Sequence, residues 1–154
     1  MKQLITIEGK TELVKAFNKL QKEKRYWVQE KKTAADLGDL SENAEYHAAE
    51  EHIRNIDKKL FEIDSILNNA QVVDISKRNK DIVCFGSKVT LLKEDSEKVC
   101  YQIVGTNELL YLQKTNNDCL YISNLSPMGK ELLRKKVGDS FVVNDFEYEI
   151  LEII

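Results

Sequence analysis

Residues 44–70 read AEYHAAEEHIRNIDKKLFEIDSILNNA, and their apolar side chains recur in alternating steps of three and four residues. The recurring positions are Tyr46, Ala49, Ile53, Ile56, Leu60, Ile63, Leu67 and Ala70. A period of about 3.5 residues is typical of a coiled-coil seam, where one narrow stripe of a helix packs on a partner helix. This stretch is therefore predicted to be a long helix with one apolar stripe and an otherwise charged surface.

The segment before it, residues 11–35, is predicted to supply the partner helix. It is rich in Lys, Glu, Gln, Leu and Ala, which favour helices. Its seam positions are Leu13, Phe17, Leu20, Trp27 and Ala34, with Lys24 and Lys31 in the gaps. Because only a short turn joins the two segments, we expect an antiparallel hairpin. A helix of about 30 residues is about 45 Å long, so this turn lies at the tip of a long arm.

The turn itself, ADLGDLSENAEY, is acidic and has no nearby cation. Its acids are Asp36, Asp39, Glu42 and Glu45. No Lys or Arg occurs between Lys32 and Arg54, so mutual repulsion at the tip costs stability unless a cation is sometimes bound there. A purely structural interpretation also exists. Gly38 can end the first helix, and Asp39 can cap the second with Glu42 as its capping-box partner, while Ser41 is a competing cap.

A metal-binding interpretation accounts for the position of these acids at the end of an arm. Asp39 and Glu42 are three residues apart, so their side chains can converge outward. Two carboxylates alone hold Mg²⁺ poorly, because this ion takes octahedral oxygen ligands and usually shares them with water and phosphates. The tip is therefore interpreted as half of a metal site that a partner completes.

After residue 70 the pattern changes to that of short strands, which predicts an α+β chain of two domains, 1–75 and 76–154. The predicted strands are 71–75, 81–92, 98–104, 109–112, 119–123, 140–143 and 146–154. Residues 127–135, PMGKELLRK, are predicted to form one short helix that begins near Pro127. The second domain should thus be a small, mostly antiparallel sheet.

Composition narrows the possible functions. The net charge of −3 argues against sequence-independent binding to a DNA backbone. No apolar run is long enough to cross a membrane and no signal peptide is found, so a cytoplasmic protein is expected. Cys84, Cys100 and Cys119 are odd in number and flanked by apolar residues, which suggests reduced thiols in strands. His47 and His52 are five residues apart rather than four, which disfavours a helical zinc site.

Two long motifs resemble the GreA/GreB family of bacterial transcript cleavage factors. These are GDLSENAEYHAA at 38–49, and FGSKV, YQIVG and YISNLSPMGKELLRKKVGD between 85 and 139. The resemblance covers the whole chain. It implies a coiled coil that enters the secondary channel of RNA polymerase and an FKBP-like C-terminal domain that docks on the channel rim. It further implies a monomer that is not an enzyme by itself, has no intrinsic cofactor, contacts no membrane, and stimulates cleavage of backtracked RNA.

By position, the resemblance makes Asp39 and Glu42 the catalytic pair, which would share Mg²⁺ with the polymerase active centre near the RNA 3′ end. Ser41, Asn43 and Tyr46 would support the tip. His47 is either a proton shuttle or an ordinary surface histidine.

The resemblance also suggests two contact regions outside the tip. Arg54 and Lys58 would contact RNA, although a solvated helix face with ion pairs is the favoured interpretation of these two residues. Ser126, Pro127 and Met128 would meet the polymerase, while Ser126 can also cap the short helix with Pro127 as its first residue.

Three other functions remain open at this point. A secondary-channel regulator of the same fold can inhibit the polymerase without stimulating cleavage. A prolyl isomerase is suggested only by the FKBP-like fold, and fold alone does not carry function. A plain coiled-coil adaptor would not need the tip acids.

Overall fold

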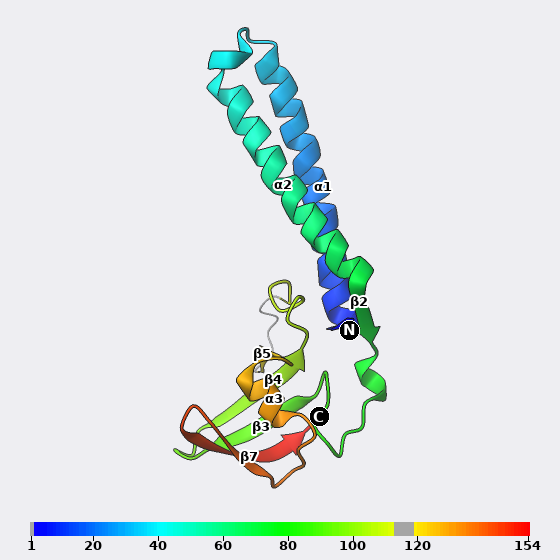
Figure 1. Ribbon diagram of the computed structural model, residues 1–154, viewed down its shortest axis with the longest axis vertical. Coiled ribbons are helices and arrows are strands. Elements are labelled where there is room, and N and C mark those ends of the chain that lie inside the picture. Colours follow the sequence, from blue (N-terminus) through cyan, green and yellow to red (C-terminus); the bar gives the residue numbers. More distant parts are fainter. Residues whose placement is uncertain (1, 113–118) are drawn as a thin grey trace. The chain divides into compact units, whose positions relative to one another are not determined.

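The computed structural model describes residues 2–112 and 119–154, which form two compact units (Figure 1). One unit spans Glu12–Asn69. The other joins the residues before Glu12 to Ala70–Ile154. The predicted division of the chain at residue 75 rests on the change from a helical to a strand pattern, and it stays a prediction.

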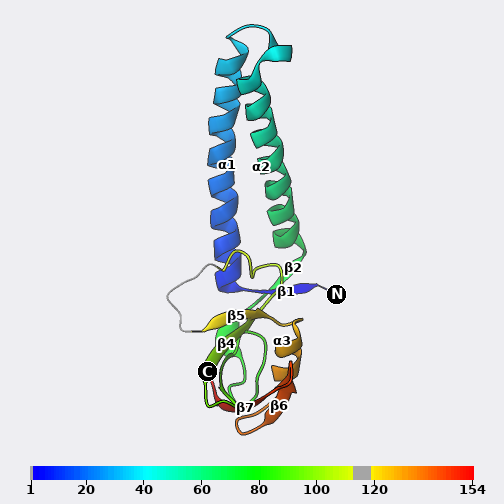
Figure 2. The ribbon, with the colours of Figure 1, turned by 90° about the vertical axis from the view of Figure 1, so that its left-hand side faces the viewer.

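The first unit is the predicted antiparallel helical hairpin. Helix α1 spans Ile7–Ala35, a 3₁₀ turn η1 spans Leu40–Glu42, and helix α2 spans Ala44–Asn69. Figure 2 shows the two helices side by side and joined at one end. Every predicted seam position is buried or half-buried, and the most buried are Leu13, Ala34, Ala49, Ile56 and Ile63. The seam prediction is therefore confirmed.

The charged seam positions of α1 pair across the hairpin. Lys24 Nζ lies 2.7 Å from Asp57 Oδ1, and Lys31 Nζ lies 3.9 Å from Glu50 Oε2. Between these pairs the rings of Trp27 and His52 stack with centroids 3.8 Å apart. Each of these contacts joins one residue of α1 to one residue of α2.

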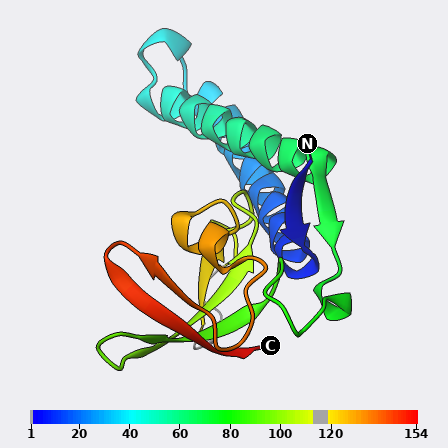
Figure 3. The same ribbon diagram turned by 60° about the horizontal axis from the view of Figure 1, so that its bottom comes forward.

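A five-stranded sheet dominates the second unit, in the order β5-β4-β3-β7-β6 (Figure 3). The strands are β3 (Lys88–Lys93), β4 (Lys98–Val104), β5 (Leu120–Ser123), β6 (Ser140–Val143) and β7 (Phe146–Ile153). All pairs are antiparallel except β4 with β5. Helix α3 (Pro127–Leu132) contributes Leu132 to a core that includes Val89, Leu91, Ile103 and Ile150. The predicted fold class is confirmed.

The short strand β1 (Gln3–Thr6) at the start of this unit was not predicted, whereas β2 (Ala70–Val73) corresponds to the strand expected at 71–75. Strand β1 pairs in parallel with β2, and α1 begins directly after β1. The predicted helix started at residue 11, so the structure extends it by one turn at its N-terminus. The four residues of β1 carry too little periodicity to be recognised.

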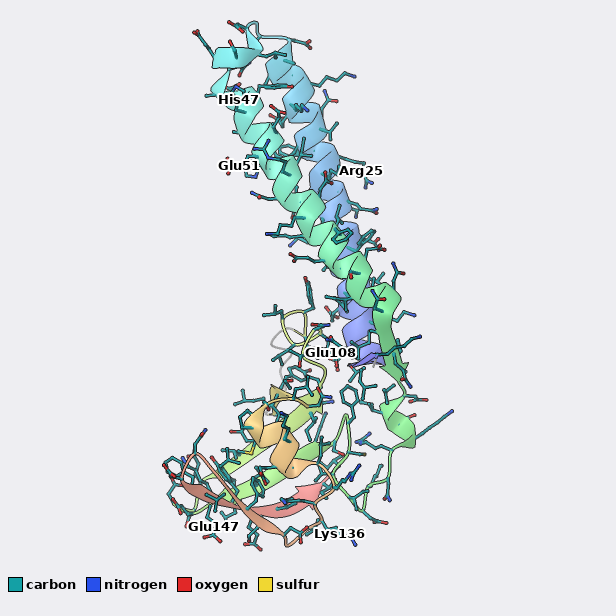
Figure 4. The ribbon with its side chains drawn as sticks, in the orientation of Figure 1. Arg25, His47, Glu51, Glu108, Lys136 and Glu147 are labelled. Atoms are coloured by element: carbon teal, nitrogen blue, oxygen red, sulfur yellow. A yellow bond between two sulfur atoms is a disulfide. The ribbon has the colours of Figure 1, made fainter. Side chains whose placement is uncertain are left out.

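Glu108 anchors this N-terminal segment to the sheet. Its side chain is fully buried, and its Oε2 accepts hydrogen bonds from the backbone N and Oγ1 of Thr6, both at 2.8 Å. Its Oε1 accepts from the backbone N of Gly105 at 2.7 Å. Gly9, in the first turn of α1, leaves room for the carboxylate, since a Cβ there would lie 1.6 Å from Glu108 Oε2. Figure 4 labels Glu108.

Two strand predictions were wrong in whole or in part. Residues 109–112 form a turn, because the amides of Tyr111 and Leu112 each donate to the carbonyl of Glu108 at 2.9 Å. The predicted strand at 81–92 is a strand only from Lys88 onward. Local hydrogen bonds outweigh the apolar and aromatic composition of these segments.

The expectation of three reduced cysteines was also wrong. Cys100 and Cys119 form a disulfide, with their Cα atoms 4.5 Å apart, and only Cys84 is a free thiol. The parallel pairing of β4 with β5 brings Cys100 and Cys119 together, and that pairing cannot be read from the spacing of the cysteines. In the described residues, none of the helices is long and apolar enough to span a membrane.

Candidate functional site at the hairpin tip

The tip begins after α1, and Gly38 is the residue at which the chain turns away from that helix. Gly38 has a φ of 129°, a conformation that favours glycine, as predicted. Asp39 follows, and its Oδ1 accepts hydrogen bonds from the backbone N of Ser41 at 3.0 Å and from Ser41 Oγ at 2.8 Å. Asp39 is therefore the N-cap of η1, the turn that also carries Glu42.

Asn43 is the residue that ties the tip to both helices. Its Oδ1 accepts from the backbone N of Tyr46 at 3.0 Å, and its Nδ2 donates to the carbonyl of Ala34 at 2.7 Å. Asn43 thus caps the start of α2 and holds the last turn of α1 at the same time. Its half-buried position protects both bonds from water.

The predicted capping arrangement was wrong in its details. Asp39 caps η1 rather than α2, Glu42 closes no capping box with it, and the cap of α2 is Asn43 rather than Ser41. The cause is the 3₁₀ turn, which moves the start of α2 to Ala44. An Asn directly before the seam pattern is itself a recognised cap signal, so Asn43 was the better candidate. The structure leaves both acids free to face solvent.

The two acids share an open depression at the tip. Asp39 and Glu42 are exposed, and the depression is lined by Leu37, Asp39, Glu42, Asn43, Ala44 and Glu45. The hydrogen bonds from the backbone and hydroxyl of Ser41 lower the pKa of Asp39 below its ordinary value of 3.8. Asp39 is consequently ionised at neutral pH, and no Lys or Arg of the hairpin lies within 4.0 Å of either acid.

The tip can supply ligands but cannot complete a metal site. Among residues 2–112 and 119–154, no group of three or more His, Cys, Asp or Glu side chains is arranged to hold a metal ion. Two exposed carboxylates fit Mg²⁺ as partial ligands, because this ion accepts one or two protein carboxylates and takes its other oxygens from water or phosphates.

Comparisons with known proteins identify the family. A family model for the N-terminal part of transcription elongation factors matches residues 3–72, and the model described as "Transcription elongation factor, GreA/GreB, C-term" matches residues 78–154. Together they cover both units. The chain belongs to the GreA/GreB family of transcription elongation factors.

Curated relatives extend the match along the chain. GreA of Nitratiruptor sp. is 38% identical, covering 99% of this chain and 93% of the relative. GreA of Lachnoclostridium phytofermentans is 39% identical, covering 99% and 95%. GreA of Rhodospirillum rubrum is 48% identical over 71% of this chain and 67% of the relative. Among solved structures, the GreA factor homolog 1 (Gfh1) of Thermus thermophilus superposes with a TM-score of 0.46 at 19% identity, covering 100% of this chain and 99% of its own.

Arg54 and Lys58, the candidate RNA contacts of this GreA/GreB protein, are exposed on α2. Within the hairpin, which is described throughout, no carboxylate lies within 4.0 Å of either cation. Asp57, the residue before Lys58, pairs with Lys24 of α1. Their exposure fits the solvated helix face, the ion pairs expected on that face are not seen at Arg54 or Lys58, and their RNA contact stays a prediction.

The loop that the GreA/GreB resemblance assigns to docking has mixed roles. Ser126 Oγ accepts from the backbone N of Gly129 at 3.0 Å and donates to the carbonyl of Ser123 at 2.6 Å, so it caps α3 as expected. Met128 packs against the core, whereas Pro127 is exposed. Of the three predicted contact residues, Pro127 is thus the exposed one, and Leu125, two residues earlier in the chain, is 58% exposed.

Substituting Asn43 tests the two hydrogen bonds that its side chain makes at the tip of this GreA/GreB hairpin. Asn43→Asp keeps the acceptor for Tyr46 but replaces the donor to Ala34 with a carboxylate that repels the carbonyl. We expect the free energy of unfolding to fall by about 1–2 kcal/mol, and by about 2–3 kcal/mol for Asn43→Ala, which loses both bonds. Denaturant unfolding followed by far-ultraviolet circular dichroism measures this.

Asn55→Asp is the matched control, because Asn55 is exposed in the middle of α2. It should change the free energy of unfolding by less than about 0.5 kcal/mol. Wild-type stability in Asn43→Asp would contradict the assignment of Asn43 as the anchor of both helices.

Proposed function

We propose that this GreA/GreB family member stimulates RNA polymerase to cleave backtracked RNA. The hairpin enters the secondary channel, and the tip brings Asp39 and Glu42 to the polymerase active centre. The observation that carries the proposal is the pair of exposed carboxylates at the end of the hairpin, held on one turn and not neutralised by the hairpin itself. A structural cap would not need both acids to face solvent.

The chemistry assigned to the tip is that of a ligand and water-positioning group. Asp39 and Glu42 would add oxygen ligands to the polymerase's loosely held second Mg²⁺ and would orient a water toward the RNA phosphodiester. A metal pair in a polymerase stabilises the attacking and leaving oxygens of phosphoryl transfer. The hydrogen bonds from Ser41 keep Asp39 ionised and restrict its rotation, so the carboxylate arrives already oriented.

This chain is not proposed to be an enzyme alone. With two carboxylates and no third ligand in the described residues, the tip depends on the polymerase for the rest of the metal site. The alternative, a secondary-channel regulator that inhibits without cleavage, uses the same fold. The presence of both acids favours cleavage, because an inhibitor that only blocks the channel does not require them.

Arg54 and Lys58 are proposed to hold the extruded RNA segment through its phosphates. Because the hairpin provides them with no anionic partner, they are available for such a contact. We expect Arg54→Ala to slow cleavage of complexes backtracked by many nucleotides by about threefold to tenfold, and to affect those backtracked by one or two nucleotides less. Gel analysis of defined backtracked complexes measures both. Equal slowing of the two would argue against an RNA contact.

The proposed function is tested by incubating the purified protein with a stalled bacterial elongation complex and Mg²⁺. We expect a short 3′ RNA fragment to appear, and the shortened transcript to resume elongation when nucleotides are added. A protein that binds the complex but only slows elongation, with no fragment released, would establish the inhibitory alternative.

A further inference from the structure

The side chain of His47 contacts the turn that carries the tip acids. His47 lies in the first turns of α2, and Figure 4 labels it close to the tip. Its Nε2 is 3.3 Å from the carbonyl oxygen of Ser41. A carbonyl oxygen can only accept, so Nε2 carries a proton and donates to Ser41. The imidazole thus reaches back from the helix to the preceding turn.

This hydrogen bond restrains the peptide group between Ser41 and Glu42. The carbonyl of Ser41 belongs to the peptide bond whose nitrogen is that of Glu42, so holding this oxygen fixes the plane from which the Glu42 side chain departs. The other side of Ser41 is held by Asp39, which accepts from both its backbone N and its Oγ. Ser41 is therefore the link between the two acids, and His47 holds the end of it nearer Glu42.

The second ring nitrogen of His47 lies near an acid on the next turn of α2. Its Nδ1 lies 3.6 Å from Glu50 Oε1 on the next turn of α2. The other oxygen of Glu50 lies 3.9 Å from Lys31 Nζ on α1. A chain of polar contacts consequently runs from α1 through Glu50 and His47 to the tip turn. Both of these distances exceed that of a hydrogen bond, so the role of His47 rests on the contact of its Nε2 with Ser41.

We propose that His47 is a positioning residue for the tip acids: by donating to the Ser41 carbonyl, it holds η1 so that Asp39 and Glu42 face the same depression. This inference rests on the proposed cleavage function for its effect on rate. It assigns His47 neither a proton shuttle nor a metal ligand, since its polar contacts are with the Ser41 carbonyl and with Glu50. The role requires a donor at the position of Nε2.

Two amide variants show whether a hydrogen-bond donor is needed at the position of Nε2 or whether any polar side chain suffices. The amide nitrogen of Gln reaches about as far as Nε2 of His, whereas that of Asn reaches only as far as Nδ1. With a stalled elongation complex, we expect His47→Ala to lower the maximal cleavage rate by about tenfold, with an unchanged half-saturating concentration of the factor. His47→Gln should restore the rate to within about threefold of wild type, and His47→Asn should not.

His52→Gln is the matched control, because His52 lies on the same helix and stacks on Trp27 away from the turn. It should cleave at the wild-type rate. Wild-type cleavage by His47→Ala, or equal rescue by His47→Asn and His47→Gln, would overturn the inference.

A second measurement in the free protein keeps the inference separate from the proposed function. Backbone amide order parameters of residues 41–43, measured by NMR, should fall in His47→Ala and recover in His47→Gln, while those of His52→Gln stay at wild-type values. If wild type releases no RNA fragment, the proposed function fails, and the order parameters alone decide the positioning role. Unchanged order parameters in His47→Ala would then overturn it.

Discussion

Replacing Asp39 by Asn, or Glu42 by Gln, is expected to lower the stimulated RNA cleavage rate by about 100-fold each while leaving polymerase binding nearly unchanged. The isosteric amides remove the charge and keep the shape. The side-chain amide introduced by Asp39→Asn would still offer an oxygen to Ser41, so the turn stays formed and the loss reports the carboxylate itself. Each tenfold loss corresponds to about 1.4 kcal/mol of transition-state stabilisation.

The chain contains a matched control for the Asp39 substitution. Asp74 begins a second Asp-x-Ser turn, η2 (Ile75–Lys77), and its Oδ1 accepts from the backbone N and the Oγ of Ser76 at 3.0 and 2.6 Å. Asp74→Asn therefore makes the same local change outside the hairpin. It should leave cleavage at the wild-type level.

Single-turnover cleavage at saturating factor measures the chemical step, and competition with a labelled wild-type protein measures binding. Equal cleavage by wild type and by the Asp39→Asn, Glu42→Gln double variant would show that the tip acids do not take part. A parallel loss of binding would instead make them contact residues.

The largest expected effect on stability comes from Gly9→Ala. In an exposed helix this substitution stabilises by about 1 kcal/mol. Here the new Cβ would lie 1.6 Å from Glu108 Oε2 and 2.9 Å from its Cβ, so the buried carboxylate must leave its position. It would then lose both hydrogen bonds from Thr6, and we expect the free energy of unfolding to fall by about 2–4 kcal/mol.

A double-mutant cycle isolates this contact. Glu108→Ala alone should destabilise, because the buried backbone N atoms of Thr6 and Gly105 lose their acceptor. Once Glu108 is removed, Gly9→Ala should cost nothing or stabilise by up to about 1 kcal/mol. Lys10→Ala, an exposed neighbour in α1, is the control and should change stability by less than about 0.5 kcal/mol. If the losses in the free energy of unfolding from Gly9→Ala and Glu108→Ala were additive, the two residues would not be in the contact described.

The pH dependence of stability gives an independent readout of Glu108. Burial raises the pKa of Glu108 above its ordinary value of 4.5, although the hydrogen bonds from Gly105 and Thr6 oppose the rise. The folded chain therefore binds this proton more tightly than the unfolded chain. The contribution to stability is greatest below pH 4.5 and declines as the pH rises through the raised pKa. The stability of wild type minus that of Glu108→Gln should accordingly fall with rising pH.

The helical hairpin was predictable because its pattern is long and regular. Eight predicted seam positions, from Tyr46 to Ala70, repeat without interruption, the first seven lie in α2, and burial follows them. The sheet was predicted less exactly. Its strands are short, and the segment at 109–112 is held as a turn by bonds to the carbonyl of Glu108, which composition does not reveal.

At the candidate site, the acids were predictable from the sequence, but the contacts that hold them were not. Asp39 and Glu42 are recognisable from charge and from the family resemblance. The bond from Asn43 to Ala34 links residues on different helices, and the contact of His47 with Ser41 depends on the 3₁₀ turn. The hydrogen bond from Thr6 to the buried Glu108 joins residues 102 positions apart. Such tertiary partners become visible only when the chain is folded.

The most direct test of the account is a Mg²⁺ titration of RNA cleavage in a stalled elongation complex, with and without saturating factor. If Asp39 and Glu42 provide ligands to the polymerase's second ion, wild type should lower the Mg²⁺ concentration for half-maximal cleavage by about tenfold or more. The Asp39→Asn, Glu42→Gln double variant should leave it at the value of polymerase alone. If the double variant lowers it as much as wild type does, the central claim is contradicted.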